Sequence, residues 1–280
     1  MYVNDLPSSL TRSFCTLYAD DTCISLANNN FSELFETLNY DLVNLHRWLS
    51  TNRLTLNVSK TVAINFSTRP APLNSNCELK VNSETVQFVK HASYLGVVLD
   101  QRLSFAQHID KLCSKISKNI GIIRRLSSVV PRPILRTLYF SLVNPYLTYC
   151  IIIWGNSRAV HIDKLYLLQK RAVRILAGVG FHEHSNPLFT SLNIMKVREM
   201  YRFSCCKYVY KHRQHYPNNE ILHHTRQAGN IPVNFERLDV TQNSIFFNPP
   251  KYFNSLPDHL KSSYLPLNRF VKEAKSSIMN

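Results

Sequence analysis

Phe14-Cys15-Thr16-Leu17-Tyr18-Ala19-Asp20-Asp21-Thr22-Cys23-Ile24-Ser25-Leu26 is the stretch that decides how this chain is interpreted. Two short apolar runs flank adjacent carboxylates, a pattern that predicts a β-hairpin with Asp20 and Asp21 at its tight turn. Neighbouring carboxylates repel, so each favours protonation unless a cation neutralises the pair. Hard oxygen ligands of this kind suit Mg²⁺. An Asp-Asp surface turn without function is the alternative, because Asp is a common turn residue.

The charge of the chain is strongly basic and unevenly distributed. The 280 residues carry a net charge of +15. Residues 1–100 contain 7 Lys and Arg against 9 Asp and Glu, whereas residues 101–280 contain 26 against 9. This asymmetry predicts a polyanionic partner that binds mainly to the second part. A solvated basic surface without function is the alternative.

Cysteine usage and hydropathy bear on the compartment. The seven cysteines include no CxxC pair, which predicts reduced thiols in an intracellular protein, nuclear or cytoplasmic. Residues 1–7 lack the basic and apolar regions of a signal peptide. Residues 137–157 carry no charge and are long enough to cross a bilayer, but they contain Pro145 and several polar residues. We therefore expect a buried helix broken near Pro145 and no membrane span.

The hydrophobic periodicity changes near residue 100. Asn30-Phe31-Ser32-Glu33 has the pattern of a capping box, and it begins an amphipathic helix that we expect to end near Ser50 and to pack on a sheet. The next runs are typical of strands, and beyond Gln101 the periodicity is helical. We expect strands at 61–66, 78–81, 85–89 and 94–99 with a turn at 82–83, helices at 105–123, 134–146, 162–176 and 187–216, and an irregular tail with short elements.

Several ordered segments resemble the reverse transcriptases of non-LTR retrotransposons of the jockey type. Tyr18-Ala19-Asp20-Asp21 within a hairpin resembles their catalytic carboxylate motif, motif C. The resemblance covers essentially the whole chain. Its other segments are residues 2–7, similar to the end of the helix before that hairpin; 48–61, similar to motif D; 94–97, similar to the primer-grip turn of motif E; and 168–176 and 253–257, similar to downstream regions of these elements.

The resemblance implies an α+β fold with three regions. Residues 1–100 would form a partial palm, with antiparallel hairpins and a packed helix. Residues 101–180 would form a helical, thumb-like region, and residues 181–280 a C-terminal region of helical and irregular structure. The resemblance begins just before the hairpin, so we expect a C-terminal part of the enzyme without the fingers and the upstream motif that carries another essential Asp. The hairpin would then lack its neighbouring strand and leave an exposed edge.

The resemblance also implies catalytic roles in RNA-directed DNA synthesis from deoxynucleotides. Asp20 would be the principal ligand of Mg²⁺ or Mn²⁺ in a two-metal reaction, with Asp21 beside it. Tyr18 would anchor the hairpin through its ring, and the small Ala19 would let primer or nucleotide approach. Lys60 would lie near the triphosphate and stabilise developing charge. A solvated lysine at a turn is the alternative for Lys60.

Further residues would contact the RNA template and DNA primer. Tyr94, Leu95 and Gly96 would form a turn touching the primer backbone, where a glycine permits close approach; a plain hairpin turn is the alternative. Basic helix faces would track phosphates, with strong salt dependence and little sequence reading. A solvated face is the alternative for each. The tyrosines at 201, 208 and 210 fit core packing better than base stacking. The basic residues are Lys111, Lys115, Lys118, Arg124 and Arg125, with Lys170, Arg171 and Arg174 as a second group.

Two functions therefore remain open on sequence. The first is a fragment of a retrotransposon reverse transcriptase that is inactive alone, because two-metal chemistry requires ligands from both carboxylate motifs. The second is a non-enzymatic nucleic-acid-binding remnant that uses its basic helical half.

Overall fold

The computed structural model describes residues 3–67, 78–82, 84–216, 230–233, 237–261 and 265–279. The chain divides into two compact units. The sheet unit comprises residues 1–94 and 99–102, and the helical unit comprises residues 95–98 and 103–280. The described part of the chain is thus mixed α and β, as expected.

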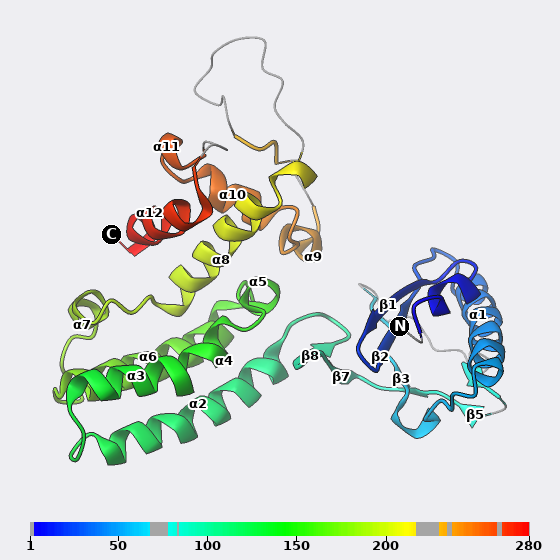
Figure 1. Ribbon diagram of the computed structural model, residues 1–280, viewed down its shortest axis with the longest axis horizontal. Helices are drawn as coiled ribbons and strands as arrows, with labels where there is room; N and C mark the ends of the chain where they lie inside the picture. The colour runs from blue at the N-terminus through cyan, green and yellow to red at the C-terminus, as the bar shows by residue number, and fades with distance from the viewer. Residues whose placement is uncertain are drawn as a thin grey trace, which may run out of the picture. The chain divides into compact units, whose positions relative to one another are not determined.

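The predicted carboxylate hairpin is confirmed. Strand β1 (Phe14–Tyr18) pairs antiparallel with β2 (Asp21–Ser25), and Tyr18 lies opposite Asp21, so only two residues form the turn (Figure 1). Among the described residues this hairpin pairs with no third strand. The other pairs are β3 (Val62–Ala63) parallel with β6 (Gln87–Phe88), β4 (Lys80–Val81) antiparallel with β5 (Glu84–Thr85), and β7 (His91–Tyr94) with β8 (Val97–Asp100).

The sequence overestimated the strands between residues 61 and 99. The run predicted at 61–66 contains only the short β3. The run predicted at 94–99 is interrupted by Leu95 and Gly96, whose φ angles are +46° and +79°. Positive φ at both central residues of a two-residue loop gives the hairpin turn that matches strand twist, so β7 and β8 form a second hairpin. Asn82, at the predicted turn, has φ +47°; Ser83 lies outside the described residues.

Helix α1 (Phe31–Thr51) begins where the sequence predicts. The Asn30 side chain accepts a hydrogen bond from Ser32 N at 3.1 Å and satisfies one of the free donors of the first turn. The Asn30 N–H donates to Asn28 Oδ1 at 2.9 Å. The N-cap is therefore present, but the reciprocal bond that Glu33 would make in a capping box is replaced by a local turn.

The apolar stripe of α1 supplies the core of the sheet unit. It packs against a short 3₁₀ helix, η1 (Leu6–Ser9), and against β4. Each fully buried aliphatic or aromatic side chain contributes about 1.5–3 kcal/mol to folding. The buried residues of this core are Leu6, Phe35, Leu42, Leu45, Leu49, Leu79, Val81 and Val86.

The helical unit is built around α2, as the apolar periodicity predicts. Helix α2 lies beside α3 and α6 (Figure 1). Five residues of its predicted stripe, from Ile109 to Ile123, are buried. The charge-free stretch is helical and broken before Pro145, which stands at the start of α4 where its missing N–H costs nothing. The helices are α2 (Ala106–Leu126), α3 (Arg132–Leu142), α4 (Asn144–Thr148), α5 (Ile151–Trp154), α6 (Ala159–Ala177), α7 (Asn186–Ser191) and α8 (Val197–Lys211).

The tail is more regular than the sequence indicated. Pro266 comes directly before α12 (Leu267–Met279) and so begins this helix without breaking it. Phe270 and Ala274, one turn apart, are fully buried against a cluster that includes Val209 and Phe253, and this packing stabilises the helix. The remaining elements are η3 (Arg213–His215), α9 (Asp239–Gln242), α10 (Asn248–Asn254) and α11 (Asp258–Lys261).

Both downstream motifs of the sequence contain structural residues. The fully buried Gln169 amide donates to Tyr139 Oη at 3.0 Å and Met195 O at 3.1 Å, and accepts from Val197 N at 2.8 Å. Asn254 accepts from Ile231 N at 2.9 Å and donates to Ile231 O at 2.8 Å. Buried amides with satisfied partners specify packing. Among the described helices, none is both long enough and apolar enough to cross a bilayer.

Candidate functional site

The two carboxylates lie at the exposed tip of the β1–β2 hairpin. Ala19, the first turn residue, has φ +53°, a conformation that costs energy for any residue with a Cβ. Asp20 and Asp21 are both exposed, as metal ligands that must meet an external substrate would be. The Tyr18 side chain is 64% exposed and Phe14 71%. The ring is thus mostly exposed among the described residues, and its expected anchoring of the hairpin stays a prediction.

Asp41 binds the backbone directly before the hairpin, and the sequence did not identify this residue. This α1 residue is fully buried. Its Oδ1 accepts from Thr11 N at 2.8 Å and Thr11 Oγ1 at 2.7 Å, and its Oδ2 accepts from Arg12 N at 3.3 Å and Ser13 N at 2.9 Å. Burial alone raises the pKa of Asp41, but the hydrogen bonds from Ser13 and Thr11 outweigh it and hold the pKa well below its usual range.

The Asp41 clamp fixes the chain directly before β1. Residues 11–13 lead into Phe14, so the position of the hairpin depends on these four bonds. The signal in the sequence was an acidic residue on the apolar face of the helix, because Asp41 lies three residues after Leu38 and four before Leu45.

Tyr94 is the predicted site residue that the structure brings close to the hairpin. Its hydroxyl is buried and has no hydrogen-bond partner among the described residues. Burial raises the pKa of Tyr94, and the nearby Cys23 and Asp21 raise it further. The Tyr94 hydroxyl, at the end of β7, therefore lies near Cys23 and Asp21 of β2 within the sheet unit.

The Leu95-Gly96 turn is held by helical-unit residues that the sequence did not single out. Tyr149 Oη donates to Leu95 O at 2.7 Å. A Cβ built on Gly96 would lie 3.3 Å from the Tyr149 ring, so both the positive φ and this close approach favour glycine. Val98 N donates to Nδ1 of the buried His108 at 3.3 Å. The predicted turn exists, and two side chains from the helices fix its position.

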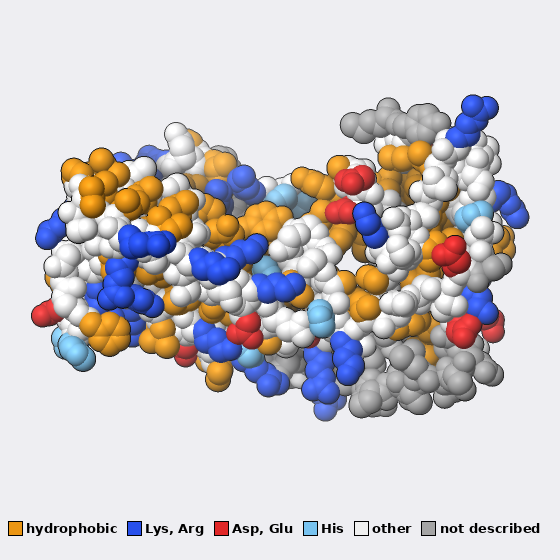
Figure 2. Space-filling model, turned by 90° about the horizontal axis from the view of Figure 1, so that it is seen from below, with side chains coloured by type: hydrophobic (Ala, Val, Ile, Leu, Met, Phe, Trp, Pro, Cys, Tyr) orange, Lys and Arg blue, Asp and Glu red, His pale blue; other side chains and the backbone are white. Residues whose placement is uncertain are grey.

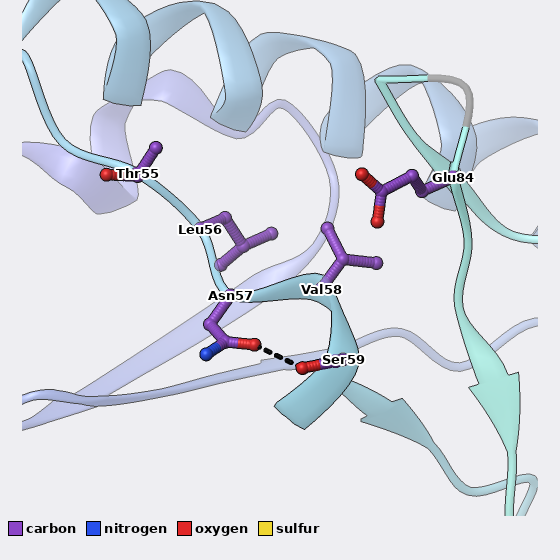
Figure 3. A pocket seen from close by; sticks show the side chains of 6 residues that line it. All are labelled: Thr55, Leu56, Asn57, Val58, Ser59 and Glu84. Carbon is purple, nitrogen blue, oxygen red and sulfur yellow. Dashed lines mark hydrogen bonds between the residues drawn. The ribbon is translucent and has the colours of Figure 1, made fainter.

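Lys60 lies at the end of a 3₁₀ helix, η2 (Val58–Lys60), and is exposed. It forms no ion pair within the described part of the chain, and no recorded contact joins it to Asp20 or Asp21. Its neighbours line an open hollow of about 500 Å³ (Figure 3). Asn57 Oδ1 organises this wall by accepting from Ser59 Oγ at 2.7 Å and Lys60 N at 3.2 Å.

The turn offers two carboxylates, Asp20 and Asp21, as ligands for a metal ion. Across the described ranges, no group of three His, Cys, Asp or Glu side chains could hold a metal ion. Mg²⁺ is often bound by one or two carboxylates, several waters and substrate phosphates, so Asp20 and Asp21 fit a magnesium ion that arrives with a nucleotide.

Most of the predicted basic residues of α2 share one stripe. Lys111, Lys115, Lys118 and Arg125 recur at helical spacing and are exposed. Arg124 is also exposed but lies on another side of the helix. Lys115 Nζ lies 5.6 Å from the centroid of the Tyr146 ring in α4, so its ammonium group also contacts the protein. Figure 2 shows Lys and Arg side chains outnumbering Asp and Glu over the face of the molecule in that view.

The basic residues of α6 are tied more closely to the protein. Lys170, Arg171 and Arg174 are half-buried on the side of α6 away from the core. Lys170 Nζ lies 4.5 Å from the centroid of the Tyr166 ring. Arg174 Nε donates to the backbone oxygen of Glu183 at 2.8 Å, so its guanidinium orders the loop after α6. Lys170 and Arg174 therefore make contacts within the helical unit.

Together these features define a class of protein: a mixed α and β chain with a carboxylate-bearing hairpin and a basic helical unit. Comparison with known sequences shows what the chain is similar to. The resemblance to RNA-directed DNA polymerases of non-LTR retrotransposons is confirmed over about 70–80% of the chain. No protein-family model matches the chain, and no solved structure is significantly similar to it.

Three relatives illustrate the similarity. The chain is 25% identical over 209 residues to a probable RNA-directed DNA polymerase from transposon BS of Drosophila melanogaster, covering 73% of this chain and 23% of the relative. It is 22% identical over 208 residues to the RNA-directed DNA polymerase from mobile element jockey of the same species, covering 72% and 22%. It is 23% identical over 239 residues to a probable RNA-directed DNA polymerase from the Drosophila melanogaster transposon X-element, covering 81% and 25%. The chain thus spans about a quarter of the length of these relatives.

Proposed function

We propose that this chain works as part of an RNA-directed DNA polymerase of a non-LTR retrotransposon. In this proposal the sheet unit is a partial palm, and the helical unit is a thumb-like region followed by a C-terminal region. The observation that carries the proposal is the exposed Asp20-Asp21 turn, fixed from behind by the Asp41 clamp and flanked by Tyr94. Similarity to RNA-directed DNA polymerases over about 70–80% of the chain supports it.

Asp20 and Asp21 would hold Mg²⁺ or Mn²⁺ in this role. The metal would activate the primer 3′-hydroxyl and stabilise the charge that develops on the transferred phosphate. Asp20 is the principal ligand and Asp21 the supporting one. The strained turn keeps both carboxylates at the tip, where an incoming nucleotide and primer end can reach them. Tyr94 and the Leu95-Gly96 turn would position the primer backbone, and Lys60 would neutralise phosphate charge at the rim.

This segment does not transfer nucleotides by itself in our proposal. Two-metal chemistry clamps both the attacking and the leaving oxygen and uses more ligands than one hairpin supplies. Asp20 and Asp21 would therefore act with carboxylates from elsewhere in a longer polypeptide. The basic stripe of α2 and the basic residues of α6 would bind the phosphates of template and primer.

Primer extension with Mg²⁺ or Mn²⁺ tests this part of the proposal. The chain alone should extend an annealed DNA primer on RNA no faster than the Asp20→Ala variant does. A polypeptide that also contains the upstream region should extend it, and Asp20→Ala should abolish that activity. Extension by the chain alone that disappears in Asp20→Ala would contradict inactivity. Full activity of the longer Asp20→Ala protein would contradict the metal role.

The alternative is a nucleic-acid-binding protein without catalysis. The observation that favours it is the excess of 26 Lys and Arg over 9 Asp and Glu after residue 100. Binding of a primer–template duplex, followed by fluorescence anisotropy across salt concentrations, tests the surface that both functions share. The Lys111→Gln/Lys118→Gln variant should lower the salt slope by about 1.8, at about 0.9 per phosphate contact.

The Lys272→Gln/Lys275→Gln variant in α12 carries the same change of net charge and serves as the control. It should keep most of the wild-type slope, because these lysines lie outside the α2 stripe. Equal slopes for the two variants would show that only net charge matters and would contradict a defined phosphate-binding stripe.

A further inference from the structure

A small hollow between α5 and α8 is separate from the carboxylate hairpin and from the basic residues of α2 and α6. It has a volume of about 230 Å³ and lies entirely within the helical unit. Ile151, which is 2% exposed, forms its floor together with the half-buried Ile152 and Tyr208. Ser204, Lys207 and Lys211 line it from α8. An apolar floor and a cationic rim thus face the same space.

The two lysines are available for an external anion. Lys207 and Lys211 stand one helical turn apart, so both ammonium groups emerge on the same side of α8. Neither forms an ion pair in the described part of the chain, and no Asp or Glu lines the hollow. Two such cations on the rim of a cavity attract a group with more than one negative oxygen, such as a phosphate.

The floor has the chemistry of a base-stacking surface. The Tyr208 ring lines the hollow and packs against the His212 ring, with 4.5 Å between the ring centroids. Isoleucine and tyrosine surfaces receive flat rings, because apolar area is removed from water without loss of hydrogen bonds.

We infer that this hollow binds one unstacked nucleotide of a single nucleic-acid strand. The base would lie on Ile152 and Tyr208, above the buried Ile151, and its flanking phosphates would contact Lys207 and Lys211. A duplex is unsuitable because its bases are stacked and paired, whereas a single strand can turn a base outward. The inference rests on the proposed nucleic-acid binding and adds a strand type and a site. The partner is a single strand and not a free mononucleotide, because two lysines one helical turn apart can contact the phosphates on both sides of one nucleotide.

Anisotropy of a fluorescein-labelled 12-nucleotide uridine RNA tests the phosphate contacts in the full-length chain. The Lys207→Gln/Lys211→Gln variant should lower the salt slope by about 1.4, at about 0.7 per contact on a single strand. The charge-matched Lys272→Gln/Lys275→Gln variant should lower it by less than half as much. Equal slopes for the wild type and the Lys207→Gln/Lys211→Gln variant would overturn the inference.

An abasic strand of the same length tests the base contact. Wild-type protein should bind it about fivefold or more weakly, the loss expected for one stacked base. Ser204→Phe fills the hollow, so it should bind the two strands with nearly equal affinity; circular dichroism melting checks that it folds. If Ser204→Phe is unfolded, the salt slope of the Lys207→Gln/Lys211→Gln variant still decides whether the strand binds at this hollow. A base preference that survives in folded Ser204→Phe would overturn the inference, as would binding of free uridine monophosphate as tight as that of the strand.

The proposed function and the inference about the hollow can be refuted separately. Absence of RNA binding by the wild-type protein overturns both the proposed function and this inference. RNA binding that is unaffected by changes at Lys207, Lys211 and Ser204 overturns only the inference.

Discussion

Replacement of Asp41 by Asn should loosen the hairpin that carries Asp20 and Asp21. The side chain accepts four hydrogen bonds, two at each carboxylate oxygen. An amide has one oxygen, so its NH₂ group must face two of the former donors. Each buried group left unsatisfied costs about 1–3 kcal/mol. We therefore expect Asp41→Asn to lower the free energy of unfolding of the sheet unit by about 2–4 kcal/mol.

The effect should depend on pH in a defined direction. The pKa of Asp41 is depressed in the folded state, so its contribution is present above the unfolded pKa and is lost as pH falls. With an unfolded pKa of about 3.9 and 1.36 kcal/mol per pKa unit, about 1.3 kcal/mol is lost between pH 7 and pH 3. The difference between wild type and Asp41→Asn should shrink by that amount.

Urea unfolding followed by tryptophan fluorescence measures the free energy of unfolding of the wild type and of Asp41→Asn at both pH values. The chain has two tryptophans, Trp48 in the sheet unit and Trp154 in the helical unit. A Trp154→Phe background makes the signal specific for the sheet unit. Glu36→Gln removes a charge from the exposed side of the same helix and should change stability by less than about 0.5 kcal/mol. A loss in Asp41→Asn no larger than that in Glu36→Gln, or a loss that is equal at pH 7 and pH 3, would refute the clamp.

The remaining predictions concern the second hairpin and its contacts. Gly96→Ala should destabilise the chain by about 1–2 kcal/mol in thermal melts, because φ is +79° and the new Cβ would meet the Tyr149 ring at 3.3 Å. The control Gly121→Ala, with nothing within 4 Å of the new Cβ, should stabilise it by about 0.5–1 kcal/mol, and the opposite ranking would contradict the turn geometry. Burial, with the nearby Lys111 and Lys115 charges, lowers the pKa of His108, so its contribution to stability should be lost as pH falls below about 6.5. Urea midpoints at pH 7.5 and pH 5.5 should converge in His108→Gln, and an undiminished difference would show that another group titrates.

The sequence predicted correctly those elements that are determined by interactions between residues close in the chain, namely the β1–β2 hairpin and helix α2. The alternation around Asp20 and Asp21 was enough for the hairpin, since a two-residue turn and its strands depend on adjacent residues. The stripe from Ile109 to Ile123 was enough for α2, because a 3.6-residue period is readable in one helix. The same reasoning overestimated strands at 61–66, which contains only the two residues of β3, and at 94–99, where a turn with positive φ overrides β-propensity.

The sequence alone determined the acidic turn, the basic second part and the similarity to retrotransposon polymerases. Only the tertiary structure decided what surrounds that turn. It leaves the Tyr18 ring exposed, buries Asp41 among the donors that fix the hairpin, and brings Tyr94 beside β2. It also groups Lys207 and Lys211 around an apolar hollow. These relations join residues far apart in the chain, and hydrogen bonding and burial between distant segments leave no periodic pattern in the sequence.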